Sequence, residues 1–198
     1  MSVNRAKRPS RAATVDVILE AARACYLHEG IDATGMREVA ARAGIARSTL
    51  YRYFPRRDDL LLAVMKEEML AVNVSIQRRV QSFDDFPDQV VEGLLFAIRA
   101  INRRPLLRAV FVAAEAGRVR SVLWESADFL SFGDELMRYV IEPAQASGML
   151  QDAVSADVLT EWIYRQLLSF LTLPSQRIRG EEELRATLHA LLVPVLLQ

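Results

Sequence analysis

Apolar residues recur every three or four positions along almost the whole chain, and no convincing stretch alternates with a period of two. The clearest early example is a stripe at i, i+1, i+4, i+5, i+8 and i+9, formed by Val17, Ile18, Ala21, Ala22, Cys25 and Tyr26. A late stripe at i, i+4, i+7, i+8 and i+11 consists of Leu184, Leu188, Leu191, Leu192 and Val195. Only 8 Gly and 7 Pro interrupt the 198 residues. The pattern predicts an all-α fold of about nine helices.

Three helices are expected near the N-terminus, after a basic, aperiodic arm of about a dozen residues. The first starts at the N-cap candidate Thr14 and ends at Gly30, where the missing Cβ permits a left-handed cap. The second spans 35–43 with Thr34 as its cap, and the third spans 47–53. Between them, Gly44 permits a sharp turn, and the following Ile45 is expected to be buried.

Longer helices are expected in the remainder of the chain. Pro143 falls inside one of them and should kink or end it, because proline lacks the amide donor. We therefore predict two domains, 1–57 and 58–198. The helices expected in the second domain cover approximately 58–81, 88–102, 105–117, 121–146, 157–173 and 181–197.

Charge is divided unevenly although the formal net charge is zero. Residues 1–57 hold 11 Lys or Arg against 5 Asp or Glu, whereas residues 58–198 hold 14 against 20. Attraction to phosphate depends on local charge, so the distribution fits a nucleic-acid-binding head joined to an acidic body. Moderate asymmetry also arises by chance, so charge alone does not decide the matter.

The second and third expected helices have the layout of a helix-turn-helix, with a short support helix, a glycine turn and a second helix able to lie in the major groove. Leu50 and Phe54 would point inward. The outward face can hydrogen-bond base edges and phosphates, and it consists of Arg47, Ser48, Thr49, Tyr51 and Arg52. Ordinary packing of two short helices could produce the same pattern.

The amino-acid sequence of this region resembles that of one known family. Residues Gly30 to Leu62, which include the run Thr49-Leu50-Tyr51-Arg52-Tyr53-Phe54, closely resemble the TetR family of bacterial transcriptional regulators. With the first helix, the resemblance covers about a quarter of the chain. It implies an all-helical homodimer with an N-terminal DNA-binding domain and a C-terminal domain that carries the dimer interface and a ligand cavity.

The resemblance also implies roles for individual residues. Thr34 would start the second helix near a phosphate, and Arg37 would lie on its groove side. Bases would be contacted by Arg47 and Ser48, with Arg52 serving either base or phosphate. The backbone contacts would come from Thr49, Tyr51, Tyr53 and Arg57, although Tyr53 could equally be a packed core residue.

Two positions depart from the family pattern. Ala46 stands where a serine often caps the recognition helix, which would weaken that helix by about 1 kcal/mol without a substitute cap. Gly35 stands where a second Ser or Thr is common, so one phosphate contact is expected to be missing.

Pairing and ligand binding are assigned to the second domain. The apolar stripes of 157–173 and 181–197 favour a homodimer through these helices, with ordinary intrachain packing as the alternative. A pocket between the middle helices would be lined by some of the aromatic residues, although aromatics at helical spacing are more often core. The candidates are Phe96, Phe111, Trp124, Phe129, Phe132, Tyr139 and Trp162, of which fewer than half are expected to contact ligand.

The sequence gives little support for a metal site, a cofactor, a membrane span or an enzyme. The single Cys25 lies on an apolar stripe and is interpreted as core, and with two histidines it leaves too few ligands for structural zinc. No cofactor motif is present. The sequence has no apolar run of 18 residues that would indicate a membrane span and no signal that would indicate secretion. We therefore expect the protein in a reducing cytoplasm. An enzyme using Glu115, or Asp134 with Glu135, has no spacing in its favour.

The sequence therefore predicts a homodimeric transcriptional regulator, a repressor that binds palindromic DNA and is released by a small, mainly apolar effector. The alternative from another class is a helical protein-interaction module without DNA binding.

Overall fold

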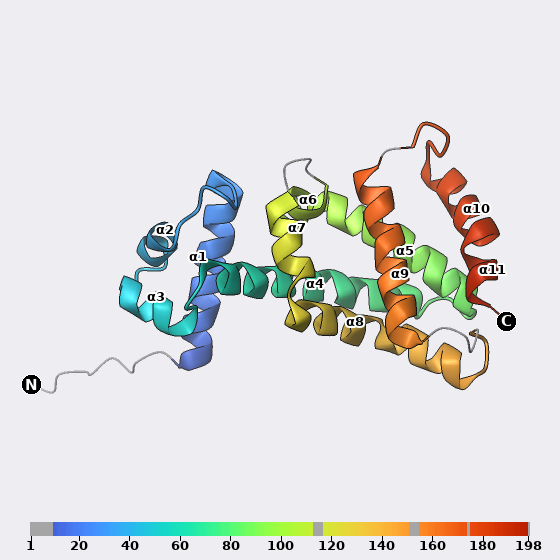
Figure 1. Ribbon diagram of the computed structural model, residues 1–198, viewed down its shortest axis with the longest axis horizontal. Helices are drawn as coiled ribbons and strands as arrows, with labels where there is room; N and C mark the ends of the chain where they lie inside the picture. Colours follow the sequence, from blue (N-terminus) through green and yellow to red (C-terminus); the bar gives the residue numbers. More distant parts are fainter. Residues whose placement is uncertain (1–9, 113–116, 151–154, 174, 198) are drawn as a thin grey trace, which may run out of the picture. The chain divides into compact units, whose positions relative to one another are not determined.

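A computed structural model describes residues 10–112, 117–150, 155–173 and 175–197 (Figure 1). In these ranges the secondary structure is helical apart from one isolated bridge between Leu150 and Leu197, which confirms the all-α class. Within the same ranges, none of the helices combines the length and the apolar character needed to cross a membrane. Eleven helices are described there, more than the nine expected: α1 (Arg11–Glu29), α2 (Met36–Arg42), α3 (Arg47–Tyr53), α4 (Arg57–Val80), α5 (Phe86–Arg103), α6 (Pro105–Phe111), α7 (Gly117–Trp124), α8 (Ala127–Ala146), α9 (Ala156–Thr172), α10 (Glu181–Leu191) and α11 (Val193–Leu196).

The chain forms two compact units, residues 1–65 and 66–198, so the division falls inside α4 and later than the boundary at 57/58 drawn from sequence. In the N-terminal unit, α1 packs on α2 and α2 packs on α3. Its core is formed by side chains of which at most 2% is exposed: Ile18, Ala22, Cys25, Val39, Ala40, Leu50, Leu60, Leu61, Val64 and Met65. The prediction that Cys25 is core is confirmed, and its burial raises the pKa of the thiol.

The first helix starts earlier than the sequence predicted. Ser10 is the N-cap of α1, and its hydroxyl accepts a hydrogen bond from the amide of Ala13 at 3.1 Å. Thr14 lies inside the first turn, where its own hydroxyl donates to the carbonyl of Ser10. The assignment of Thr14 as the cap was therefore wrong, and Arg11, expected in the arm, belongs to the helix. The rest of the predicted arm, residues 1–9, lies outside the described residues.

In the C-terminal unit, α5 packs against α6, α8, α9 and α10, and α8 packs against α7 and α9. The buried positions of α5 follow the apolar stripe of an amphipathic helix: Val90, Val91, Leu94, Leu95 and Ile101 are each at most 5% exposed. Helix α5 is thus the packing centre of this unit, and the C-terminal helix α10 is held against it.

Three helix boundaries in this unit differ from the sequence prediction. The expected helix 105–117 ends at Phe111, and 121–146 is interrupted at Glu125 and Ser126 between α7 and α8. The expected helix 181–197 divides at Leu192, because Pro194 lacks the amide donor that would continue α10 but fits the first turn of α11.

Pro143 does not end its helix. Helix α8 continues to Ala146, three residues beyond the proline. Val140, Ile141 and Ala144 around it are at most 6% exposed, so burial of this segment offsets the hydrogen bond that proline removes. Of the two effects expected of Pro143, a kink or an end of the helix, the structure therefore contradicts the end.

A buried carboxylate joins three helices of the C-terminal unit. Glu92 on α5 is 7% exposed, and its Oε1 lies 2.5 Å from Nε of Arg185 on α10. Its Oε2 lies 3.7 Å from Nη2 of Arg79 on α4. The hydrogen bond from Arg185 is the main cause that lowers the pKa of Glu92 below its ordinary value of 4.5. The ionised form of Glu92 therefore stabilises the docking of α10 on α5.

We expect Glu92→Gln to lower the free energy of unfolding of this unit by about 2 kcal/mol at pH 7, because the variant loses a largely buried, charge-assisted contact. A carboxyl whose pKa is depressed by folding stabilises the fold above its unfolded pKa and loses that contribution as pH falls through the folded pKa. The difference between wild type and variant should therefore shrink below about pH 4.5. Urea unfolding followed by tryptophan fluorescence measures it, since both tryptophans lie in this unit. Glu142→Gln, which removes an exposed ion pair with Arg138, serves as control and should change little.

Candidate functional site

Helix α3 presents a polar face and buries its apolar one. Leu50 is fully buried and Phe54, the residue after the helix, is 9% exposed. The bounds of α3 and the inward direction of both side chains confirm the sequence prediction. The exposed residues of the helix are Arg47, Ser48, Tyr51 and Arg52, whereas Thr49 and Tyr53 are half-buried.

Aromatic rings support the arginines of this face. The guanidinium of Arg47 lies 5.8 Å from the ring centre of Tyr51. Tyr53 is contacted by two guanidinium groups, that of Arg52 at 5.4 Å and that of Arg11, from α1, at 5.9 Å. Such cation–π contacts favour positions in which the charge stays exposed while the side-chain stem is held. The N-terminal unit therefore carries a cationic surface built from Arg11 of α1 and from Arg47 and Arg52 of α3.

The turn between α2 and α3 uses a glycine where the backbone requires one. Gly44 has φ +67°, and the amide of Ile45 donates to the carbonyl of Ala40 at 3.1 Å. Ile45 is half-buried, so the expectation of full burial was wrong. Ala46 is the N-cap of α3 and provides no side-chain hydrogen bond, as the sequence predicted. The first turn of α3 is thus stabilised by packing of Leu50 and not by a polar cap.

Thr34 has a structural role in the connection from α1 to α2. Its side chain is 2% exposed, and its hydroxyl donates to the carbonyl of Gly30 at 2.8 Å. The N-cap of α2 is Gly35, so the prediction that Thr34 caps this helix was wrong. The buried hydroxyl also lies off the exposed surface on which a phosphate contact was expected.

Arg37, predicted on the groove side of α2, and Arg57, predicted to contact a phosphate, both form bonds within the protein. Arg37 is exposed on α2, and its Nε lies 2.9 Å from a carboxylate oxygen of Glu38. Arg57, at the start of α4, is half-buried and donates from Nη2 to the carbonyl of Ile31. This hydrogen bond of Arg57 therefore links the start of α4 to the segment that follows α1. It also holds the Arg57 guanidinium at the edge of the cationic surface.

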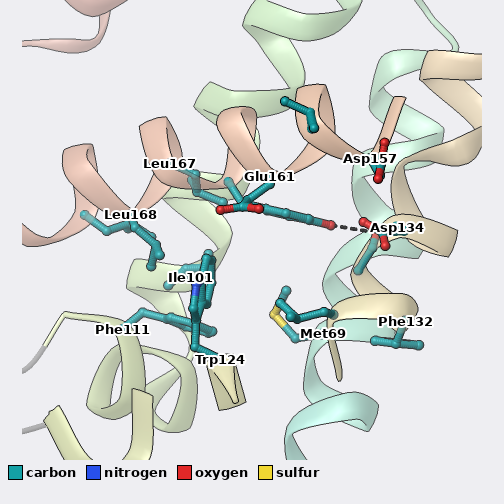
Figure 2. Close-up of a pocket in the computed structure, with 15 residues that line it drawn as sticks. Met69, Ile101, Phe111, Trp124, Phe132, Asp134, Asp157, Glu161, Leu167 and Leu168 are labelled. Atoms are coloured by element: carbon teal, nitrogen blue, oxygen red, sulfur yellow. Dashed lines mark hydrogen bonds between the residues drawn. The ribbon is translucent and has the colours of Figure 1, made fainter. Parts of the chain in front are cut away.

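A cavity of about 220 Å³ lies within the C-terminal unit, between α4, α5, α6, α7, α8 and α9 (Figure 2). It is mostly apolar, and its volume is below the roughly 300 Å³ at which common small-molecule sites begin. The lining residues are Met69, Ile101, Phe111, Trp124, Leu130, Phe132, Gly133, Asp134, Asp157, Val158, Glu161, Tyr164, Leu167, Leu168 and Leu171.

Three of the seven aromatic candidates line this cavity: Phe111, Trp124 and Phe132. Tyr139 instead lines a second cavity of about 70 Å³, where burial raises its pKa to about 12. Phe96 and Trp162 line neither of these two cavities, in keeping with the expectation that only some of the seven aromatics contribute. The ring of Phe96 lies 5.8 Å from the guanidinium of Arg99 instead. The side chain of Phe129 lies outside the described residues.

Sequence reasoning missed Tyr164, which lines both cavities. Its hydroxyl donates to the carbonyl of Gly133 on α8 at 2.9 Å, and burial raises the pKa of the phenol. A Cβ on Gly133 would lie 3.2 Å from this ring, so glycine permits the close approach. The signal was present in α9, where Asp157, Glu161, Tyr164 and Leu168 follow i, i+4, i+7 and i+11 and therefore share one helix face.

Three carboxylates line this cavity, and those of Asp134 and Asp157 stand together at one end of it (Figure 2). Burial raises the pKa of Asp134 on α8 above its ordinary value, and the nearby Asp157 raises it further. Asp157, in the first turn of α9, has a lowered pKa because the side chain of Ser155 and the backbone amides of Val158 and Asp157 donate to it. Glu161 is paired with Arg165, whose Nη2 lies at 2.5 Å. From sequence, Asp134 was a candidate only as part of a catalytic pair with Glu135, and Glu135 does not line the cavity.

Comparisons with known proteins find similarity to bacterial transcriptional regulators. Residues 18–64 match the family model described as bacterial regulatory proteins, tetR family. The chain is 27% identical to an uncharacterised HTH-type transcriptional regulator, MT1294, of Mycobacterium tuberculosis, over 96% of this chain and 88% of the relative. It is 34% identical to the transcriptional repressor KstR of Mycolicibacterium smegmatis over 53% of each chain. Among solved structures, RolR in complex with resorcinol superposes with a TM-score of 0.70 at 19% identity, covering 94% of this chain and 88% of that one.

Proposed function

We propose that this chain, which belongs to the TetR family of bacterial regulatory proteins, represses transcription as a homodimer on palindromic DNA in the cytoplasm. The premise of the proposal is that the chain is a transcriptional regulator and not an enzyme. The observation that carries the proposal is the division of α3, which exposes Arg47, Ser48, Tyr51 and Arg52 while it buries Leu50. A helix of this kind can enter the major groove with its arginines toward guanine edges.

We assign the contacts by exposure. Arg47 and Ser48, in the first turn of α3, read bases, and Arg52 contacts either a base or a phosphate. Thr49, Tyr51 and Tyr53 contact the DNA backbone through their hydroxyls, and Arg37 contacts a phosphate from α2. Thr34 is left out because its side chain is buried.

Two copies are needed because one short recognition helix offers too few contacts for a specific site. A pairing surface on α9 to α11 is supported by four large apolar side chains in this part of the chain that are more than half exposed. They are Val158 at 55%, Leu173 at 69%, Leu191 at 69% and Val195 at 56%. Burial of such residues in a four-helix bundle with a second copy would remove them from water.

The cavity supports control by a small molecule. RolR was solved with resorcinol, and a Bacillus subtilis relative in fold, FadR, with stearoyl-CoA. In this chain α4 begins at the Arg57 contact of the N-terminal unit and carries Met69 in the cavity wall. An effector that binds the DNA-free form about a hundredfold better contributes about 2.7 kcal/mol against DNA binding.

Binding to the DNA upstream of its own gene tests the proposal. We expect two chains per duplex, two symmetric protected half-sites about 10 base pairs apart, and affinity that falls steeply with salt. If each subunit neutralises three phosphates, the slope of log K against log salt is about −5. A complex that is insensitive to salt, or that holds one chain, contradicts the proposal, whereas the absence of any DNA binding favours the protein-interaction module.

A further inference from the structure

The ends of the 220 Å³ cavity differ in chemistry. Figure 2 shows Asp134 and Asp157 facing each other at one end, with Phe111, Trp124 and Leu168 gathered at the other. Among the fifteen described residues that line the cavity, three are acidic and none is basic. The site therefore joins an apolar, aromatic compartment to a region of negative potential.

The acidic end is only partly neutralised by the protein. Glu161 has its own partner in Arg165, at 2.5 Å. The ion pairs found in the described part of the chain include neither Asp134 nor Asp157. The two carboxylates act on each other as like charges, which a positive charge between them would relieve.

This arrangement discriminates between ligand charges. An anionic ligand would meet three carboxylates without a basic lining residue, which is electrostatically unfavourable. A neutral apolar ligand would cover Asp134 without compensating its charge. A cation gains the attraction of both aspartates, while its apolar body can lie against the aromatic side chains at the other end.

We propose that the effector is a compact organic cation, an amine or quaternary ammonium on a single-ring apolar body, with its charge between Asp134 and Asp157 and its ring against Phe111 and Trp124. The inference rests on the proposed function, since it names the ligand class of the same cavity. The modest cavity volume fits a molecule of this size.

Two probe compounds isolate the contribution of the ligand's positive charge to binding. Phenyltrimethylammonium and tert-butylbenzene have nearly the same shape and differ by one positive charge. Calorimetric titration of the full chain should give an affinity at least tenfold higher for the ammonium compound. The same compound should release the chain from its upstream DNA.

Substitutions at the acidic end test whether Asp134 and Asp157 cause the preference for a positively charged ligand. Asp134→Asn and Asp157→Asn should each weaken phenyltrimethylammonium about tenfold, as for loss of a contact to a charged group. Binding of tert-butylbenzene should not weaken, and this shows that the cavity of the variant is intact. Glu135→Gln removes the neighbouring carboxylate on α8, which does not line the cavity, and should leave both affinities unchanged.

The outcomes separate the two proposals. If tert-butylbenzene binds as tightly as the ammonium compound and releases DNA, the charge preference is wrong and the ligand-controlled regulator stands. Absence of phenyltrimethylammonium binding, or unchanged affinity in both asparagine variants, also overturns the inference. If the chain does not bind its upstream DNA at all, the proposed function fails, whereas the titrations still decide the preference of the cavity.

Discussion

The double substitution Arg47→Ala and Arg52→Ala is expected to weaken binding to the upstream DNA on the order of 1,000-fold while the protein stays folded. Each arginine contact to a base or phosphate is worth about 1 kcal/mol or more, and a symmetric dimer loses every contact twice. Both side chains are exposed, so thermal stability should change by less than about 0.5 kcal/mol. Fluorescence anisotropy with labelled duplex measures the affinity.

A matched control separates this loss from a general effect of charge. Arg138→Ala with Arg177→Ala removes the same charge from exposed positions of the C-terminal unit. That variant should bind DNA within a few-fold of wild type. Equal losses in the two variants would mean that the assignment of α3 as the recognition helix is wrong.

Leu50→Ala is expected to destabilise the N-terminal unit by about 3 kcal/mol, because the leucine is fully buried where α3 packs on the rest of this unit. Since no polar side chain caps α3, packing of Leu50 is the main force that holds the helix. Hydrogen exchange of residues 11–65 should accelerate, and DNA affinity should fall with the folded fraction. Tryptophan fluorescence, which reports on the C-terminal unit, should keep its unfolding midpoint.

Leu27→Ala is the control for this substitution, because Leu27 on α1 is 51% exposed and its loss should cost little. Unchanged exchange in the Leu50 variant would show that the packing of α3 does not depend on this side chain.

Local chemistry made the N-terminal unit predictable. The spacing of Leu50 and Phe54 and the break at Pro55 determine α3, and the structure has the same bounds. The start of α1 was missed because both Ser10 and Thr14 are good caps, and only the packed structure shows that Ser10 accepts the amide of Ala13. Thr34 was misassigned for a similar reason, since a threonine before a helix can cap it or, as here, bond back to Gly30.

The C-terminal unit depends more on contacts between distant segments. The continuous helical pattern around Glu125 gave no sign of the break between α7 and α8, and burial near Pro143 outweighed its local preference. Aromatic residues alone could not define the cavity: Trp162 and Glu161 are adjacent, yet about 100° apart on α9, and only Glu161 lines it. The acidic end joins residues of α8 and α9, a pairing that no sequence spacing reveals.

The most direct test of the central claim, that α3 enters the major groove, is methylation interference on the upstream DNA. Methylation at N7 of guanine modifies the major groove, whereas methylation at N3 of adenine modifies the minor groove. The account predicts two clusters of interfering guanines, about one helical turn apart and related by two-fold symmetry. Interference confined to adenine N3, or a single cluster, would contradict it.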